Sequence, residues 1–104
     1  MKQSKYRNQP TYIDGIRFMS KREADRYLQL KILSAAKIIT DLTLQPIFPI
    51  VLSGYKVCRV IMDFEYYENG QRIVEDVKGK DNAMSKLKRK LFEAVYGIKI
   101  TVTK

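Results

Sequence analysis

The chain has 104 residues, which suit one small domain, and 45% of them are apolar. Its formal net charge of +9 favours a polyanionic partner, although a merely soluble basic protein has the same composition. The lack of histidine excludes imidazole-based catalysis and histidine-bound zinc, and the single cysteine, Cys58, excludes an intrachain disulfide and a thiolate zinc cluster.

Hydrophobic periodicity and turn signals predict a single α/β domain over residues 1–104. In chain order the predicted elements are a basic arm over 1–10, a hairpin over 11–19 turning at Asp14-Gly15, a helix from Ser20 to about Lys37, an extended segment over 42–52, strands over 57–67 and 72–78, a helix over 82–95 and a strand over 98–102. Pro46 and Pro49 mark the extended segment as an edge or irregular strand. The last helix and strand permit a right-handed crossover, so the expected fold is helix, three antiparallel strands, helix and strand, in a mixed sheet flanked by helices.

The Asn69-Gly70 pair is the strongest hairpin signal in the chain and suits a two-residue type I′ turn. Such a turn places Glu68 opposite Gln71, and the same register places Asp63 directly opposite Asp76. Their Cβ atoms are then expected to lie roughly 4.5–5.5 Å apart on one face of the hairpin.

The two faces of this hairpin are expected to differ in polarity, since side chains alternate along a strand. The predicted core face carries Val60, Met62, Phe64, Tyr66, Ile73 and Val77. The predicted polar face carries Ile61, Asp63, Glu65, Tyr67, Arg72, Val74, Asp76 and Lys78. Glu75 falls on the apolar face, which makes Asp76 the better candidate ligand of that adjacent pair, although a slip of one residue reverses the assignment.

Two facing carboxylates repel each other, and one of them should hold a proton unless a cation lies between them. Mg²⁺ or Mn²⁺ held by Asp63 and Asp76 fits this arrangement, because hard cations take oxygen ligands and Mg²⁺ often completes its shell with a substrate phosphate. Lys78, on the same face, is a candidate for offsetting charge that develops on phosphorus. The alternative is a solvated acidic face that Arg72 and Lys78 neutralise.

Glu23 is a third candidate acid with two interpretations. Residues 20–23 match a capping box, in which Glu23 bonds back to the Ser20 amide, and the same carboxylate is a possible metal ligand.

Basic residues on both predicted helices are candidate phosphate contacts, although charged helix faces are often only solvated. They are Lys21, Arg22, Arg26 and Lys31 on the first helix, and Lys86, Lys88, Arg89 and Lys90 on the second. Four tyrosines could stack on unpaired bases or serve in a core or interface, namely Tyr6, Tyr12, Tyr66 and Tyr67.

Asp63 followed by Asp76-Val77-Lys78 resembles the PD-(D/E)XK motif of the restriction-endonuclease-like nuclease superfamily. The predicted order of elements covers nearly the whole chain and is similar to that superfamily's core. Five further stretches look like a small phage-encoded branch similar to Holliday-junction resolvases and phage endonuclease I; they are residues 5–8, 14–18, 20–24, 44–46 and 74–79. Met62 stands where the motif name has proline, which weakens the match more than the chemistry.

The resemblance implies a role for each matched position. Asp63 and Asp76 correspond to the two metal-ligating acids, and the Val77 carbonyl to a further ligand. Lys78 corresponds to the catalytic lysine, and Glu23 to the first-helix glutamate of resolvase-type members.

The expected function is therefore a metal-dependent endonuclease that cuts branched DNA, working as a homodimer that makes paired nicks. A non-catalytic basic module for RNA or DNA, and a nuclease acting on linear ends or flaps, remain open alternatives. A cytoplasmic location, that of the host cell for a phage protein, is expected because the sequence has no signal-peptide pattern and no apolar run of membrane length.

Overall fold

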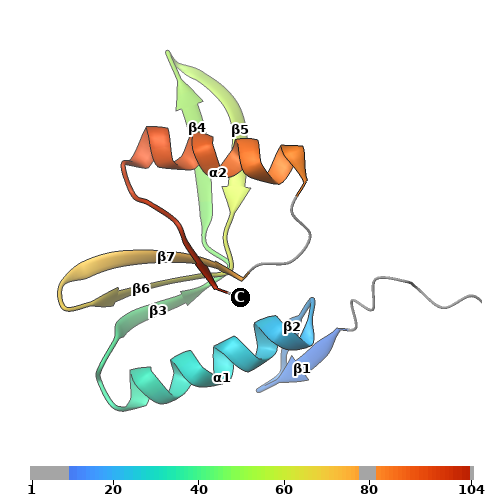
Figure 1. Cartoon of the computed structure of the whole chain (residues 1–104), viewed down its shortest axis with the longest axis vertical. Helices are drawn as coiled ribbons and strands as arrows, with labels where there is room; N and C mark the ends of the chain where they lie inside the picture. Colours follow the sequence, from blue (N-terminus) through green and yellow to red (C-terminus); the bar gives the residue numbers. More distant parts are fainter. Residues whose placement is uncertain (1–9, 78–81, 104) are drawn as a thin grey trace, which may run out of the picture.

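A computed structural model describes residues 10–77 and 82–103 of the chain. It forms an α/β fold in which a four-stranded mixed sheet lies between two layers (Figure 1). The elements are β1 (Thr11–Ile13), β2 (Ile16–Phe18), α1 (Lys21–Ala35), β3 (Thr40–Leu44), β4 (Ile47–Leu52), β5 (Tyr55–Ile61), β6 (Phe64–Glu68), β7 (Gln71–Val77), α2 (Ala83–Tyr96) and β8 (Thr101–Thr103). The predicted basic arm lies almost wholly outside the described residues.

The central sheet has the strand order β3-β6-β7-β8. Strand β6 is antiparallel to both β3 and β7, and β8, which follows α2, pairs parallel with β7. The predicted mixed sheet with two helices and a final parallel strand is thus confirmed. The specific restriction-endonuclease-like core stays a prediction.

The β6–β7 hairpin has the register that its turn predicted. Asn69 and Gly70 have φ values of 54° and 75°, as a type I′ turn requires. Glu68 faces Gln71, and the ladder continues to Phe64 opposite Glu75. The paired strand ends there, so Asp63 lies one residue before β6, at a bend.

Two of the predicted strands are wrong, because the chain leaves the sheet within each of them. The segment over 42–52 is divided into β3 and β4 at Gln45-Pro46, where Gln45 has a φ of 51°. The segment over 57–67 is divided into β5 and β6 at Met62-Asp63. The two breaks hold each other, since the Gln45 amide donates to the Asp63 carbonyl at 2.9 Å and the Met62 amide donates to the Pro46 carbonyl at 3.1 Å. Strands β4 and β5, with Cys58 in β5, therefore pair with each other as a separate hairpin.

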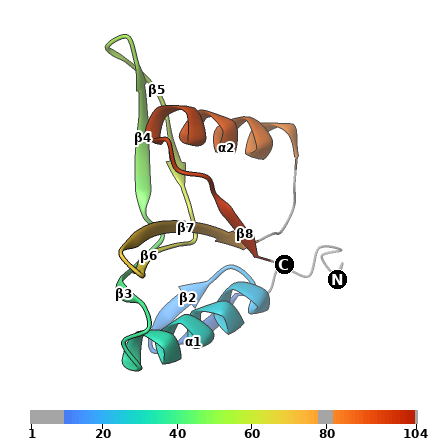
Figure 2. The same cartoon turned by 60° about the vertical axis from the view of Figure 1, so that its left-hand side comes forward.

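The two faces of the sheet bury two different clusters, and this overturns the predicted polar face. The first cluster packs α1 and β2 against the sheet and contains Phe18, Ala24, Tyr27, Leu30, Ile39, Phe64 and Tyr66. The second packs α2 and the β4–β5 hairpin against the other face and contains Phe48, Ile50, Val60, Met62, Val74, Phe92 and Ile100. Val60 and Met62 are therefore not on the face of Phe64, because the break at Met62-Asp63 interrupts the alternation. Figure 2 shows α1 and α2 on opposite sides of the sheet, as in Figure 1.

The two helices begin and end close to their predicted limits. The Ser20 side chain caps α1 by accepting from the Glu23 amide at 3.1 Å, and the helix ends at Ala35, two residues before the predicted Lys37. The Asn82 side chain caps α2 by accepting from the Ser85 amide at 2.9 Å. Gly97, with a φ of 70°, ends α2 in the left-handed conformation. Within the part of the chain that is described, no helix is long and apolar enough to cross a membrane.

Candidate functional site

Asp63 lies at the point where the chain passes from the β4–β5 hairpin into the central sheet. Its amide donates to the Glu75 carbonyl at 3.2 Å, and its carboxylate oxygen Oδ2 accepts from the Val77 amide at 2.7 Å. The carboxyl group thus bonds the backbone at the end of β7, immediately beside Asp76. Three backbone hydrogen bonds fix this bend and so hold the Asp63 side chain in place. They join Asp63 to Glu75, Gln45 to Asp63 and Met62 to Pro46.

Three acids predicted from sequence come together around this carboxyl group. Burial, a hydrogen bond with the Glu23 carboxyl and repulsion from it raise the pKa of Asp63 to about 7, against opposing effects of the Val77 amide and the Asp76 carboxyl. Burial is the largest cause of this rise, because removal from water disfavours the charged form of a carboxyl group, and the Glu23 carboxyl adds to it. The predicted cause was repulsion between Asp63 and Asp76, whereas in the structure the repulsion comes from Glu23 and Asp76 lowers the pKa of Asp63.

Glu23 reaches the site from the first turn of α1, and its side chain is only 7% exposed. The predicted bond to the Ser20 amide is replaced by one to the preceding residue, since the Met19 amide donates to Oε1 of Glu23 at 3.2 Å. The cap of α1 by Ser20 is the half of the capping box that forms. Glu23 therefore both secures the entry into α1 and contributes its carboxyl group to the site.

Asp76 closes the cluster from the end of β7 and faces α2. A guanidinium nitrogen of Arg89 lies 3.7 Å from Oδ2 of Asp76, and both side chains are about one quarter exposed (23% and 26%). Arg89 is thus half-buried against the site. Lys88 is also half-buried, so the predicted run of four exposed cations is corrected. Lys86 and Lys90 are exposed as predicted.

The donor atoms at this junction suit a hard divalent cation. Carboxylate oxygens of Asp63, Asp76 and Glu23, with the backbone carbonyl of Val77, are the ligand types that Mg²⁺ and Mn²⁺ prefer. Over residues 10–77 and 82–103, however, no three acids or cysteines already stand in the geometry of a metal cage. Lys78, the predicted catalytic lysine, lies outside the described residues.

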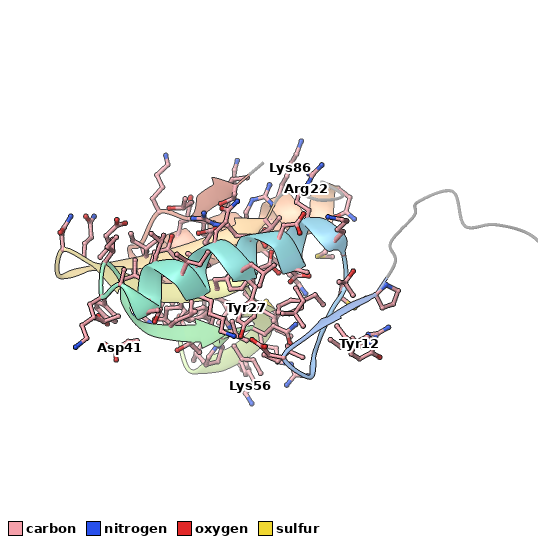
Figure 3. All side chains as sticks on the ribbon, turned by 90° about the horizontal axis from the view of Figure 1, so that it is seen from below. Tyr12, Arg22, Tyr27, Asp41, Lys56 and Lys86 are labelled. Atoms are coloured by element: carbon pink, nitrogen blue, oxygen red, sulfur yellow. The ribbon has the colours of Figure 1, made fainter. Side chains whose placement is uncertain are left out.

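Cationic side chains from both helices point to one side of the molecule. Arg22, next to Glu23 on α1, and Lys86 on α2 project to the same side in Figure 3. Lys21, also exposed, pairs with Asp25 at 3.1 Å, and Lys31 pairs with Asp14. Because such exposed pairs are weak, these lysines remain available to a phosphate.

Sequence reasoning missed a buried ionic network centred on Glu75. This carboxylate has no exposed surface and accepts from Nε and Nη2 of Arg26 at 2.6 and 3.0 Å, from the Tyr66 hydroxyl at 2.7 Å and from the Thr103 hydroxyl at 2.6 Å. Burial acts to raise the pKa of Glu75, but the hydrogen bonds from Arg26, Thr103 and Tyr66 outweigh it and leave the pKa below its ordinary value. Arg26 is therefore a structural residue, not a phosphate contact.

Arg72 has a different partner from the one predicted, and one of the predicted tyrosines is a core residue. Arg72 pairs with Glu65 at 2.5 Å rather than with Asp63 or Asp76. Tyr66 is a core residue, whereas Tyr12 is 66% exposed and Tyr67 is 37% exposed. Tyr6 lies outside the described residues.

The fold and this junction define a small α/β protein with an acidic cluster flanked by cationic helices. The chain belongs to the family described as "protein of unknown function (DUF1064)", whose family model matches residues 3–104. Comparison with curated proteins and with solved structures gave no match.

Proposed function

We propose that this protein is a metal-dependent endonuclease that hydrolyses phosphodiester bonds in DNA. The observation that carries the proposal is the meeting of three carboxyl groups, those of Asp63, Glu23 and Asp76, at one junction of a chain of net charge +9. A protein that only bound DNA would gain nothing from acids gathered beside its cations. A divalent cation would offset their repulsion and would attract the phosphate that these acids alone would repel.

Each residue then has a distinct part in the proposed reaction. Asp63, Asp76 and the Val77 carbonyl would hold the cation, with Glu23 as a further ligand, and the chemistry that it would supply is polarisation of a phosphoryl oxygen. Arg89, whose guanidinium lies 3.7 Å from the Asp76 carboxylate, would bind a phosphate oxygen of the substrate. Lys78 offsets the charge that develops on phosphorus, and Arg22, Lys86 and Lys90 hold the flanking phosphates.

The order of elements α1, β3, β6, β7, α2 and β8 supports assignment to the restriction-endonuclease-like nucleases. In this assignment, the β4–β5 hairpin of this chain is an insertion between β3 and β6. The described residues form one small fold and include no separate domain that could read base sequence. Recognition of shape and backbone suits it better, so branched DNA is the proposed substrate, cut by a homodimer in paired nicks.

The test is cleavage of a synthetic four-way junction, a flap and a linear duplex, with Mg²⁺, Mn²⁺ or a chelator. Asp76→Asn is expected to abolish cutting while binding is retained. Asp41→Asn is the matched control, because Asp41 is an exposed acid outside the site whose φ of 55° suits asparagine as well as aspartate. Undiminished cutting by Asp76→Asn would remove the proposed site.

The second candidate is a non-catalytic basic module for RNA or DNA. The contact between Arg89 and Asp76 favours it, because that pair neutralises one of the acids without any metal. This candidate predicts no product with any divalent cation. It also predicts that Asp63→Asn binds nucleic acid more tightly, because the substitution removes a repelling charge.

A further inference from the structure

The β1–β2 hairpin has an exposed face that the proposed reaction does not use. Its register places Tyr12 opposite Arg17 and Ile13 opposite Ile16. Side chains alternate along a strand, and Ile13, Ile16 and Phe18 pack into the cluster between α1 and the sheet. Tyr12 and Arg17 therefore point the other way, and both are exposed. Figure 3 shows Tyr12 pointing away from α1.

Tyr12 and Arg17 are close neighbours across the two strands. The turn at Asp14-Gly15 has φ values of 54° and 76°, typical of type I′, so the two residues that flank it form the hydrogen-bonded pair. Tyr12 and Arg17 are the next pair, which is not hydrogen-bonded and in which opposed side chains lie closer together. An aromatic ring and a guanidinium group thus lie side by side.

Both groups keep the capacity to bind a ligand. Tyr12 is 66% exposed, and among the residues that the structure describes no aromatic or cationic side chain stacks on its ring. Within the same residues, the Arg17 guanidinium has one polar contact, a bond from Nη1 to the Met19 sulfur at 3.3 Å. Because a thioether is a weak acceptor, the donors of Arg17 remain available to a phosphate.

Met19 connects this face to the acidic cluster. Its sulfur accepts from Arg17, and its amide donates to Oε1 of Glu23 at 3.2 Å. Arg17 and Met19 are two residues apart, so their Cα atoms are at most about 7 Å apart. That span equals about two steps along one strand of a duplex. The face therefore lies one or two nucleotides from a phosphate held at the acidic cluster.

The hairpin is held firmly against α1. The Tyr27 hydroxyl donates to Oδ2 of Asp14 at the turn at 3.0 Å, and Lys31 pairs with the same carboxylate. Lys31 also offsets the negative charge of Asp14, which would otherwise repel a phosphate near the face. A ring on a fixed hairpin loses little conformational freedom when it binds, which favours affinity.

We propose that Tyr12 and Arg17 bind an unpaired nucleotide next to the phosphate at the acidic cluster, with its base stacked on the Tyr12 ring and its phosphate bonded to Arg17. An unpaired base can leave the stack and offer its face to an aromatic ring. In Figure 3, Tyr12 and Arg22 lie on opposite sides of the start of α1, so a duplex arm would lie against Arg22 and the unpaired nucleotide against Tyr12. The inference rests on the proposed nuclease function and narrows its substrate to branched DNA with an unpaired nucleotide beside the cut, such as a flap.

A tryptophan at position 12 reports stacking directly, because the chain has no tryptophan of its own. Tyr12→Trp is titrated, in a chelator that prevents cutting, with a duplex that carries a single-stranded thymidine flap. The flap DNA is expected to quench the fluorescence strongly, and the same duplex without the flap should leave it nearly unchanged. Tyr55→Trp is the matched control, because Tyr55 is a 78% exposed tyrosine on the β4–β5 hairpin, and neither DNA should quench it.

Affinities for the two DNAs, measured by fluorescence anisotropy in the same chelator, test each side chain. Tyr12→Ala should weaken binding of the flap DNA about tenfold, and Tyr12→Phe, which keeps the ring, should change it by less than about twofold. Arg17→Gln should also weaken binding of the flap DNA, whereas Arg59→Gln, at an exposed arginine of the β4–β5 hairpin, should not. Circular dichroism confirms that each variant is folded.

The outcomes distinguish this inference from the proposed function. Equal quenching of Tyr12→Trp by both DNAs, or an unchanged affinity of Tyr12→Ala for the flap DNA, would overturn the inference even when the wild-type protein cuts DNA and Asp76→Asn does not. Flap-specific quenching and a loss of affinity in Tyr12→Ala, without cutting in any divalent cation, would support the nucleotide-binding face and reject the nuclease.

Discussion

Replacing Asp63 with asparagine is expected to stabilise the protein at alkaline pH in the absence of divalent cations. The native pKa of Asp63 is about 7, above its value of 3.8 in an unfolded chain. A group with a raised native pKa contributes its full stabilisation below the unfolded value and loses it as the pH rises through the native one. Asparagine cannot ionise, yet it preserves an acceptor for the Val77 amide and a donor for Glu23.

The size of the expected stabilisation follows from the difference between the native and the unfolded pKa of Asp63. Each pKa unit corresponds to about 1.4 kcal/mol, so the shift sets an upper limit of about 4 kcal/mol on the cost of ionising Asp63. Solvent contact and the proton shared with Glu23 make the actual cost of ionising Asp63 smaller than this limit. The expected gain in the free energy of unfolding for Asp63→Asn is therefore about 2 kcal/mol near pH 8. The gain should fall toward zero near pH 4.

Urea unfolding followed by circular dichroism at several pH values, with a chelator or with Mg²⁺, measures these differences. Mg²⁺ at about 100 times its dissociation constant should stabilise the wild-type protein by about 2.7 kcal/mol near pH 8, and should leave Asp63→Asn unchanged. Asp41→Asn controls for loss of a charge outside the site. If wild-type and Asp63→Asn proteins have the same pH dependence, the crowding of the acids is refuted; if Mg²⁺ stabilises neither, the proposed metal site is refuted.

Three further predictions test the surroundings of the site. Glu75→Ala should lower the free energy of unfolding by about 3–5 kcal/mol, because it leaves the buried charge of Arg26 without its partner, while Glu75→Gln should cost less; equal losses in urea would contradict this. Arg89→Gln should weaken DNA binding and reduce the salt slope by about one, measured by fluorescence anisotropy; an unchanged slope would exclude a phosphate contact. Gly97→Ala should cost about 1 kcal/mol from backbone strain alone, since no atom lies within 4 Å of the added methyl group, and should leave nuclease activity unchanged.

Local signals predicted the parts of the fold that depend on neighbouring residues. The Asn69-Gly70 turn fixed the β6–β7 register correctly, because positive φ at two successive residues selects one type of turn. Ser20 and Asn82 marked the starts of the two helices, because each helix cap is a hydrogen bond between residues only three positions apart. These features need no information about distant contacts.

The breaks at Gln45-Pro46 and Met62-Asp63 could not be predicted in this way. Each is stabilised by hydrogen bonds to the other, about 17 residues away along the chain, and neither contains a glycine. Pro46 was a partial signal, because it excluded a regular central strand. Strands β4 and β5 leave the sheet because the chain breaks at both positions. The hydrogen bonds between the two breaks explain why both breaks occur.

The sequence contained a signal for the Glu75 network, but that signal was used only to favour Asp76 as the candidate ligand. The predicted apolar face contained Glu75, and a charge on such a face requires a buried partner. Arg26 lies three residues after Glu23 on α1, at the spacing that places both on one helix face. That spacing could have suggested Arg26, but the distance of 49 residues to Glu75 gave no way to choose it over the other cations.

The position of α1 links this network to the acidic cluster. Arg26 bonds Glu75, and Thr103 bonds the same carboxylate from β8, so the helix is fixed to two strands one turn from Glu23. Asp76, the next residue after Glu75, faces the opposite side of β7 toward Arg89 on α2. Neighbouring acids on one strand thus contact different helices, one as a structural anchor and the other as a candidate ligand. Since Glu23 approaches Asp63 only when α1 is docked, loss of the Glu75 anchor should lower the pKa of Asp63, and chemical-shift titration of that carboxyl in Glu75→Gln would refute the link if the pKa stayed near 7.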